Sequence, residues 1–285
     1  MFRDVFSQDT LKQKLELTLK EKNFLLEKYY GEKPVNLENL MDLVSSMRKT
    51  VEPFRCRDAS LMVTNALKTG KKVLFEGAQG TLLDLNHGTY PFVTSSSTIA
   101  GSACVGTGIG PNSIGKIMGL TKAYSTRVGS GPFPSELNDE TGEKIRTLGD
   151  EFGATTGRPR RTGWIDLIAL KYAIRINGIT NLALTKMDVL SGFEQIGVCT
   201  HYELDGKVVD YYPTSTEDLA KAKPVVKFVK GWKEPIQSAR SVRDLPKASQ
   251  DYVTFLTSEL GTPIDVISVG PDRTQTLFMK PLFEN

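Results

Sequence analysis

Residues 153–161 combine small, hydroxyl-bearing and basic side chains in a way that could bind an anion. The run reads Gly-Ala-Thr-Thr-Gly-Arg-Pro-Arg-Arg and carries guanidinium groups at Arg158, Arg160 and Arg161. Glycine lets a ligand approach the backbone closely, and arginine binds a carboxylate or phosphate through two parallel hydrogen bonds. The run therefore predicts a receptor for an anionic ligand, and the alternative is a solvated basic turn.

A second candidate site is the tripeptide Lys186-Met187-Asp188, which follows the apolar run 182–184. A carboxylate can accept hydrogen bonds from both the ring N–H and the exocyclic amine of guanine, a donor pair that adenine lacks. The methylenes of Lys186 would lie across the flat face of the base. The tripeptide predicts guanine recognition, and the alternative is a surface lysine beside a helix-capping aspartate.

A glycine-rich turn at residues 76–81 contains Gln79, whose amide can donate to and accept from the edge of a heterocycle. Thr94 begins a segment of serines and threonines whose hydroxyls could hold a phosphate. The alternatives are a turn with a solvent-facing glutamine and a hydroxyl that caps a following turn.

Other chemistries are limited by what the sequence contains. His87 and His201 are the two histidines, and Cys56, Cys104 and Cys199 are too far apart for a CxxC pair. A multi-histidine metal site is therefore excluded, and no metal ligands are predicted in this chain. The phosphate-binding pattern GxxxxGK[ST] is absent from the sequence, so a triphosphate cradle of that kind is not encoded here.

The elements that would position these residues alternate between helix and strand. Apolar residues at fourfold spacing predict helices in the first seventy positions, and we expect further helices at about 112–125, 164–177 and 250–261. Short apolar runs predict strands at 73–75, 182–184 and 264–267, and alternating runs around Asp205-Gly206 predict a hairpin. The fold class is therefore α/β, with a mainly parallel central sheet, flanking helices and a small antiparallel annex.

We divide the chain into a helical subregion, residues 1–72, and an α/β nucleotide- and substrate-binding region, residues 73–285, which together form part of one large domain. The sequence has 36 basic and 33 acidic residues, a balance that argues against binding to nucleic acid or to a membrane surface. No apolar stretch is long enough for a membrane helix. Three widely spaced cysteines suit a reducing compartment, so we expect a cytoplasmic protein.

Seven ordered blocks of the sequence together resemble the adenylosuccinate synthetase family. The blocks are FEGAQGTLLD at 75–84, HGTYP at 87–91, KAYSTRVG at 122–129, GPFP at 131–134, EFGATTGR at 151–158, RTGW at 161–164 and GPDR at 270–273. The resemblance implies a P-loop-like synthetase fold that is N-terminally incomplete, because this sequence has no counterpart of the family's first strand and its glycine-lysine loop. The catalytic base, the catalytic histidine and the Mg²⁺ ligands would belong to that missing third.

The resemblance also implies roles for residues that are present. Gln79, Thr94 and Arg158 would bind inosine monophosphate (IMP). The aspartate-binding residues would be Ala154, Thr155, Thr156, Gly157, Arg158, Pro159 and Arg160. The GTP-binding residues would be Arg160, Lys186, Met187, Asp188, Ser268, Val269 and Gly270.

The implied activity is GTP-dependent ligation of L-aspartate to IMP, giving adenylosuccinate, GDP and phosphate on the route to AMP. GTP would be a co-substrate, Mg²⁺ the cofactor, and a homodimer the assembly. Without the family's catalytic-base loop, this chain alone is predicted to be inactive. The alternatives are a non-catalytic guanine-nucleotide-binding regulatory module and a structural fragment with no ligand affinity.

Overall fold

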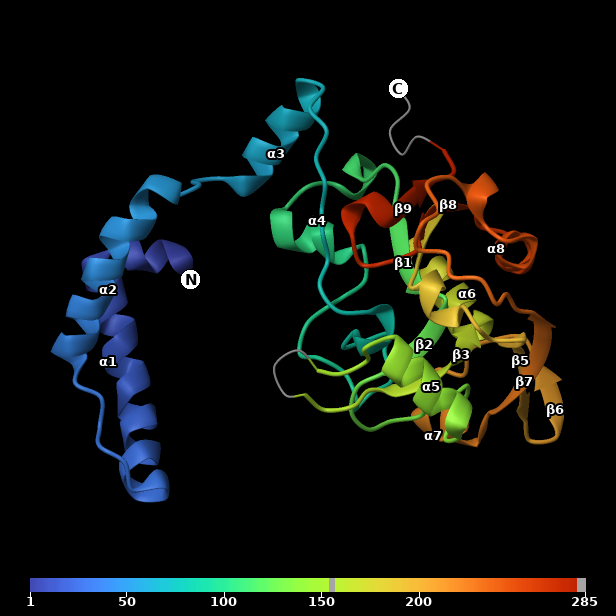
Figure 1. Cartoon of the computed structure of the whole chain (residues 1–285). Helices are drawn as coiled ribbons and strands as arrows, with labels where there is room; N and C mark the ends of the chain where they lie inside the picture. The colour runs from blue at the N-terminus through green and yellow to red at the C-terminus, as the bar shows by residue number, and fades with distance from the viewer. Residues whose placement is uncertain (154–156, 281–285) are drawn as a thin grey trace. The chain divides into compact units, whose positions relative to one another are not determined.

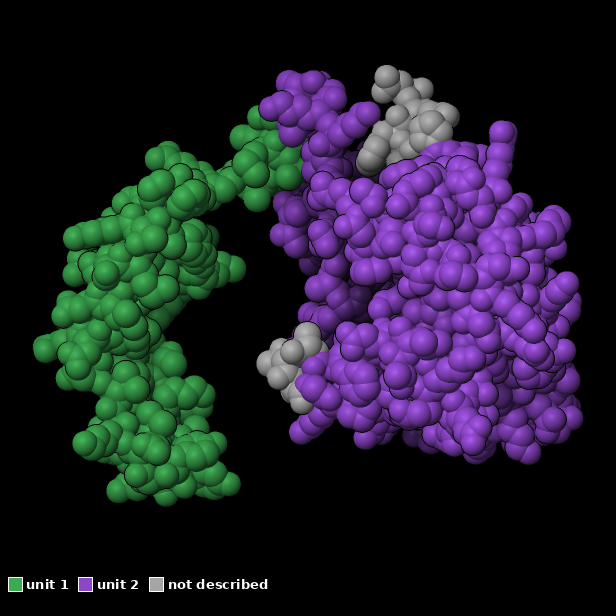
Figure 2. Space-filling model, viewed as in Figure 1, with its two compact units in different colours: residues 1–65 green, residues 66–285 purple. Residues whose placement is uncertain are grey.

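The chain divides into two compact units, residues 1–65 and 66–285, which are coloured separately in Figure 2. The coordinates are a computed structural model that describes residues 1–153 and 157–280.

The first unit is helical, as its fourfold apolar spacing predicts. It contains α1 (Gln8–Leu25), α2 (Leu37–Val51) and the start of α3 (Ala59–Lys68), with a π-helical turn at Leu26–Tyr30 and 3-10 turns at Phe2–Phe6 and Glu52–Phe54. The Asn36 side chain accepts a hydrogen bond from the Asn39 N–H and so begins α2. Asp4 is the one buried residue among residues 1–65.

The second unit contains two sheets and the helices that flank them (Figure 1). Its strands are β1 (Met118–Lys122), β2 (Tyr124–Arg127), β3 (Arg161–Asp166), β4 (Asn181–Thr185), β5 (Gln195–Leu204), β6 (Lys207–Val209), β7 (Lys223–Lys230), β8 (Ile264–Ser268) and β9 (Thr276–Phe278). Its helices after α3 are α4 (Ser102–Thr107), α5 (Glu140–Leu148), α6 (Leu167–Asn177), α7 (Thr216–Lys221) and α8 (Lys247–Leu260).

The first sheet has the strand order β1-β4-β8-β9, with the first three strands parallel and β9 antiparallel. The second sheet runs β2-β3-β5-β6, with β7 on the other side of β5. In this sheet only the β3–β5 pair is parallel, so the antiparallel part is larger than one hairpin. The predicted α/β class with a mainly parallel sheet and flanking helices is confirmed.

The apolar core lies in the second unit and joins both sheets to α6 and α8. Its fully buried members include Leu182 and Leu184 of β4, Val198 of β5, Leu256 of α8 and Ile267 of β8. Because β4 and β8 are parallel neighbours, their carboxyl ends lie at the same end of the first sheet. Open α/β sheets commonly bind ligands at the carboxyl ends of their strands.

Several predicted elements are confirmed. The predicted strands 182–184 and 264–267 lie in β4 and β8. Asp205 and Gly206 both have positive φ in the tight turn between β5 and β6, as a type I′ hairpin requires. The late helix ends at Gly261, which adopts the left-handed conformation that favours glycine.

Three predicted elements are wrong or partly wrong. Residues 112–125 contain β1 and the start of β2 instead of a helix, because pairing with β4 overrides the local helical pattern. Gly119 of β1 packs close to Ile179, whose Cδ1 atom would lie 2.7 Å from a Cβ at this position. Residues 164–166 end β3, and α6 starts only after Asp166. Residues 73–75 form no strand, and no described strand pairs with them.

Candidate active site

The turn that follows β4 carries a buried carboxylate oxygen without a hydrogen-bond partner. Lys186 adopts a left-handed backbone with φ of 61°, and Met187 is fully buried beneath the turn. The Oδ1 atom of Asp188 is buried and has no partner among the described residues. Burial raises the pKa of Asp188 above its ordinary value. This oxygen therefore keeps an unused capacity to accept a hydrogen bond.

The segment after β8 lies at the same end of the sheet as the turn after β4 and consists of Ser268, Val269 and Gly270. Strand β8 contacts the turn Met187–Leu190. Ser268 Oγ donates to the Gly270 carbonyl at 2.9 Å, and the Val269 N–H donates to the Gln275 carbonyl at 2.9 Å. A Cβ on Gly270 would displace the Gln275 carboxamide, which lies against this glycine. The structure therefore brings the two predicted guanine segments together.

Residues 151–153 and 157–160 pair with each other through backbone hydrogen bonds that we call the neck, and the segment 151–160 is called the arginine loop. The Arg160 N–H donates to the Glu151 carbonyl at 2.8 Å, and the Gly153 N–H donates to the Arg158 carbonyl at 2.9 Å. Gly157 has φ of 62°, and both Arg158 and Pro159 are exposed. Ala154, Thr155 and Thr156, which the sequence assigned to aspartate binding, lie outside the described residues.

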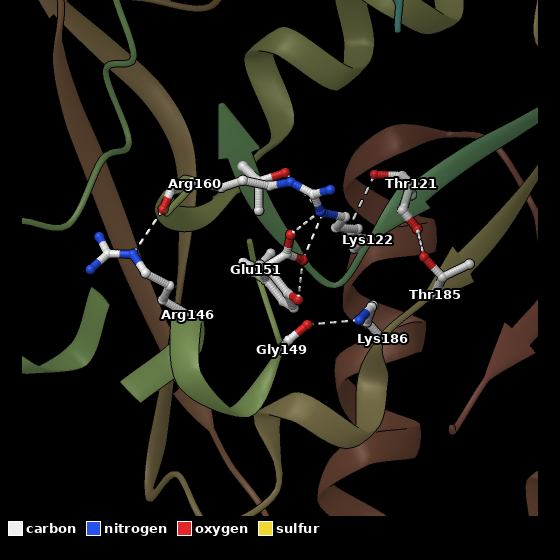
Figure 3. Close-up of polar contacts among 10 residues, drawn as sticks. Thr121, Lys122, Arg146, Gly149, Glu151, Arg160, Thr185 and Lys186 are labelled. Carbon is white, nitrogen blue, oxygen red and sulfur yellow. Dashed lines mark hydrogen bonds and ion pairs between the residues drawn. The ribbon is translucent and has the colours of Figure 1, made fainter. Parts of the chain in front are cut away.

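Glu151 sits at the neck of this loop with its side chain fully buried. Its carboxylate accepts hydrogen bonds from Lys122 Nζ at 2.7 Å and from Arg160 Nη1 at 2.6 Å (Figure 3). It also accepts one from Tyr124 OH at 2.6 Å. Burial alone would raise the pKa of Glu151, but these three hydrogen bonds outweigh it and leave the pKa lowered. One side of the Arg160 guanidinium is thus held by the Glu151 carboxylate.

Arg161 is also committed to internal partners. Its Nε donates to Glu136 Oε1 at 2.6 Å, a second guanidinium nitrogen bonds the other oxygen of Glu136, and Nη1 donates to the Gly131 carbonyl at 2.8 Å. The Arg161 guanidinium therefore holds the 129–131 turn, and its part in an anion receptor stays a prediction.

Gln79 and Thr94, which the sequence assigned to one ligand, lie in contact. Gln79 Nε2 donates to Thr94 Oγ1 at 3.1 Å, and Gln79 adopts a left-handed backbone with φ of 68°. The segment between them is organised by Asp84, which is fully buried. Its carboxylate accepts from the Asn86, His87, Thr98 and Ile99 N–H groups and from Ser97 Oγ.

Sequence reasoning missed the residues that support these sites. Lys122 and Tyr124 lie within the block 122–129, yet nothing in their spacing reveals a shared partner near residue 151. Asp84 lies in the block 75–84. Its position after a glycine-rich turn is the sequence feature that could have identified it as a supporting residue. Within residues 1–153 and 157–280, no group of three or more His, Cys, Asp or Glu side chains is placed to hold a metal ion.

The chain matches one protein family along nearly its whole length. A profile described as adenylosuccinate synthetase matches residues 1–277. The adenylosuccinate synthetase of Bdellovibrio bacteriovorus is 56% identical over 285 residues, which are 100% of this chain and 66% of that protein. That of Geotalea daltonii is 52% identical over 281 residues, covering 99% of this chain and 65% of that protein.

A solved structure agrees with the sequence matches. Fully ligated adenylosuccinate synthetase from Plasmodium falciparum superposes with a TM-score of 0.88 at 35% identity, covering 97% of this chain and 65% of that chain. The chain thus spans just under two thirds of the length of these relatives. No helix within the described ranges has the length and apolar character needed to cross a membrane.

Proposed function

The chain belongs to the adenylosuccinate synthetase family, and we propose that it carries substrate sites for GTP-dependent ligation of L-aspartate to IMP in the cytoplasm. Phosphorylation of the 6-oxygen of IMP would create a leaving group, and the amine of aspartate would displace it. In this proposal the arginine loop binds aspartate, Gln79 and Thr94 contact IMP, and the turn after β4 binds guanine.

The observation that carries the proposal is the unsatisfied Oδ1 atom of Asp188. A buried carboxylate oxygen without a donor is costly, since burial removes the hydrogen bonds that water would provide. Guanine offers two N–H donors on one edge, which match the two oxygens of a carboxylate. Ser268, Val269 and Gly270 would complete the base site from β8, because the turn after β4 contacts that strand.

Aspartate and IMP would meet at the arginine loop. Arg158 is exposed at the neck, where its guanidinium would bridge the carboxylate of aspartate and the nucleotide. Arg160, held at one edge by Glu151, would reach the ribose of GTP with its remaining donors. Gly157 and Pro159, together with Ala154, Thr155 and Thr156, are proposed to bind aspartate.

Mg²⁺ is implied by the family, but the described residues give it no set of ligands. The family's phosphate loop has no counterpart in these 285 residues. We therefore expect the chain alone to give no turnover with GTP, IMP, aspartate and Mg²⁺, and measurable adenylosuccinate formation would contradict this. We also propose a homodimer as the assembly.

The substitution Asp188→Asn tests the guanine site. An asparagine offers one acceptor and one donor, so GDP should bind at least about tenfold more weakly, a loss of about 1.4 kcal/mol. Xanthosine diphosphate, whose 2-oxo group accepts where guanine donates, should gain affinity. Isothermal titration calorimetry of the 285-residue chain with both nucleotides measures the change.

Asp251→Asn is the matched control, since Asp251 is exposed on α8 and pairs only with Lys247 in the described structure. Its nucleotide preference should equal that of the unchanged protein. The proposal would be wrong if the unchanged protein bound GDP no better than ADP, or if Asp188→Asn kept the original preference for GDP over xanthosine diphosphate.

A further inference from the structure

Glu151 joins the arginine loop to the elements on either side of it. Its three donors come from the end of β1, from the start of β2 and from the residue before β3. We propose that Glu151 is a positioning residue. It holds Arg160 and the neck of the arginine loop close to Gly149, whose carbonyl accepts a hydrogen bond from Lys186. This inference rests on the proposed substrate sites.

The neck closes through both the backbone and the side chains of Glu151 and Arg160. The Arg160 N–H donates to the Glu151 carbonyl at 2.8 Å, while Arg160 Nη1 donates to Glu151 Oε2 at 2.6 Å. Arg146 Nε in turn donates to the Arg160 carbonyl at 2.8 Å (Figure 3). Arg160 is therefore held at its N–H, at its carbonyl and at one guanidinium nitrogen, so part of its side-chain freedom is already lost before a ligand binds.

The neck is also connected to the proposed guanine-binding turn through Lys186. Lys186 Nζ donates to the Gly149 carbonyl at 2.8 Å, and Gly149 lies two residues before Glu151 (Figure 3). A Cβ at Gly149 would collide with the hydroxyl of Tyr124, so the segment fits against β2 only with glycine there. One short stretch, residues 149–151, thus contacts both Arg160 and Lys186.

The three donors around residue 151 require a carboxylate at this position. Lys122 and Arg160 bring two positive charges to a fully buried side chain, and Tyr124 adds a third donor. Burial lowers the pKa of Lys122, and the hydrogen bond and charge of Glu151 oppose that shift. A glutamine of the same shape would turn an N–H toward one of these donors and leave that donor without an acceptor.

Glu151→Gln tests the positioning role in the ligand-free protein. The Arg160 and Gly153 amides close the neck, so both should exchange with deuterium at least about tenfold faster in the variant. Glu136→Gln is the matched control because it removes the carboxylate paired with the neighbouring Arg161. Its effect on the Arg160 and Gly153 amides should be below about twofold.

Unchanged exchange at the neck in Glu151→Gln would overturn the proposal. Should that variant fail to fold, Tyr124→Phe tests the same network, since it removes one donor and no charge. It should also speed exchange at Arg160, by a smaller factor, and no change there would equally overturn the proposal.

A nucleotide titration separates positioning from general stability. Glu151→Gln should weaken GDP binding about fivefold, but have no further effect when Arg160→Met is already present, because the carboxylate acts through that guanidinium. Additive losses in the double variant would overturn the action through Arg160. If the unchanged protein bound no GDP while exchange at the neck still responded to Glu151→Gln, the guanine site would fail and the positioning role would stand.

Discussion

Asp84, Glu151 and Asp166 are buried and Asp188 is partly buried, and these four carboxylates differ in the donors that face them. Asp84 accepts from five donors, and these hydrogen bonds outweigh burial to lower its pKa to about 2. Three donors likewise leave the pKa of Glu151 lowered. Burial dominates at Asp188, where one oxygen has no partner, and at Asp166. Unmet hydrogen-bonding capacity therefore marks Asp188 as the carboxylate suited to a ligand.

Asp166 makes a testable contribution to the pH dependence of stability. Burial raises its pKa to about 6 from 3.8, although Tyr202 OH and two N–H groups of α6 donate to it. The folded state therefore binds a proton more tightly than the unfolded state, so the free energy of unfolding contributed by this group falls as the pH rises from about 4 to about 6. Asp166→Asn should remove this dependence, which amounts to about 2–3 kcal/mol at most.

Urea unfolding of both proteins between pH 4.5 and 7 measures this difference, and the variant should gain stability relative to the unchanged protein as the pH rises. Asp139→Asn is the control, because Asp139 also caps a helix but is exposed. A constant difference between Asp166→Asn and the unchanged protein across this range would show that the group does not titrate there.

At the residue scale, the sequence identified the candidate carboxylate but could not reveal which cations have internal partners. The tripeptide 186–188 was recognisable because its residue types match one edge of guanine. Arg161 looks like a ligand-binding residue in the sequence, yet its partner Glu136 lies 25 residues earlier in the chain. Such long-range ion pairs depend on the pairing of strands, which short motifs do not encode.

At the element scale, the loop that carries Gln79 and Thr94 depends on a single side chain for its shape. Residues 84–99 contain no α-helix or strand, and Asp84 binds both ends of this segment. Asparagine at this position would turn an N–H toward donors that now face a carboxylate. Asp84→Asn should therefore destabilise the protein by about 2 kcal/mol or more and loosen the segment.

Thermal unfolding and amide exchange at Thr98 measure the effect of Asp84→Asn. Asp58→Asn provides the comparison, since Asp58 accepts from the Leu61 N–H at an exposed helix start. Equal small losses in the two variants would mean that the buried carboxylate does not organise the loop. Acidification should act in the same direction, because the stabilisation from Asp84 is lost as the pH falls from about 4 to about 2.

Elements with strong local signals were predicted, and those that depend on distant partners were not. Gly261 and the Asp205-Gly206 turn fix their neighbours' conformations locally, so α8 and the β5–β6 hairpin could be found in the sequence. β1 forms because β4, more than fifty residues later, offers a parallel partner. The apolar run 73–75 has no such partner among the described strands and stays irregular.

At the scale of the whole molecule, the two units differ in how much apolar surface they bury. The hydrophobic core residues all belong to residues 66–285 within the described structure, and α1, α2 and α3 contain no buried residue. Helices of 10 to 18 residues with so little packing are marginal by themselves.

Amide exchange in native buffer should therefore be much faster in residues 1–65 than in β4 and β8, by at least about a hundredfold. Mass spectrometry of peptic fragments measures both regions in one sample. Equal protection of α1 and β4 would show that the first unit gains its stability from contacts beyond those within the unit.

The strand β7 limits how two copies of this chain can associate. It pairs with β5 alone among the described strands, so its other side is a sheet edge. That edge exposes Lys223, Lys227 and Lys230 together with Pro224, which has no N–H to donate. Two copies that aligned this strand across a twofold axis would bring ammonium groups together and lose a ladder hydrogen bond. The proposed homodimer should therefore leave this edge in water, and the same charges would prevent the sheet from growing into a fibre.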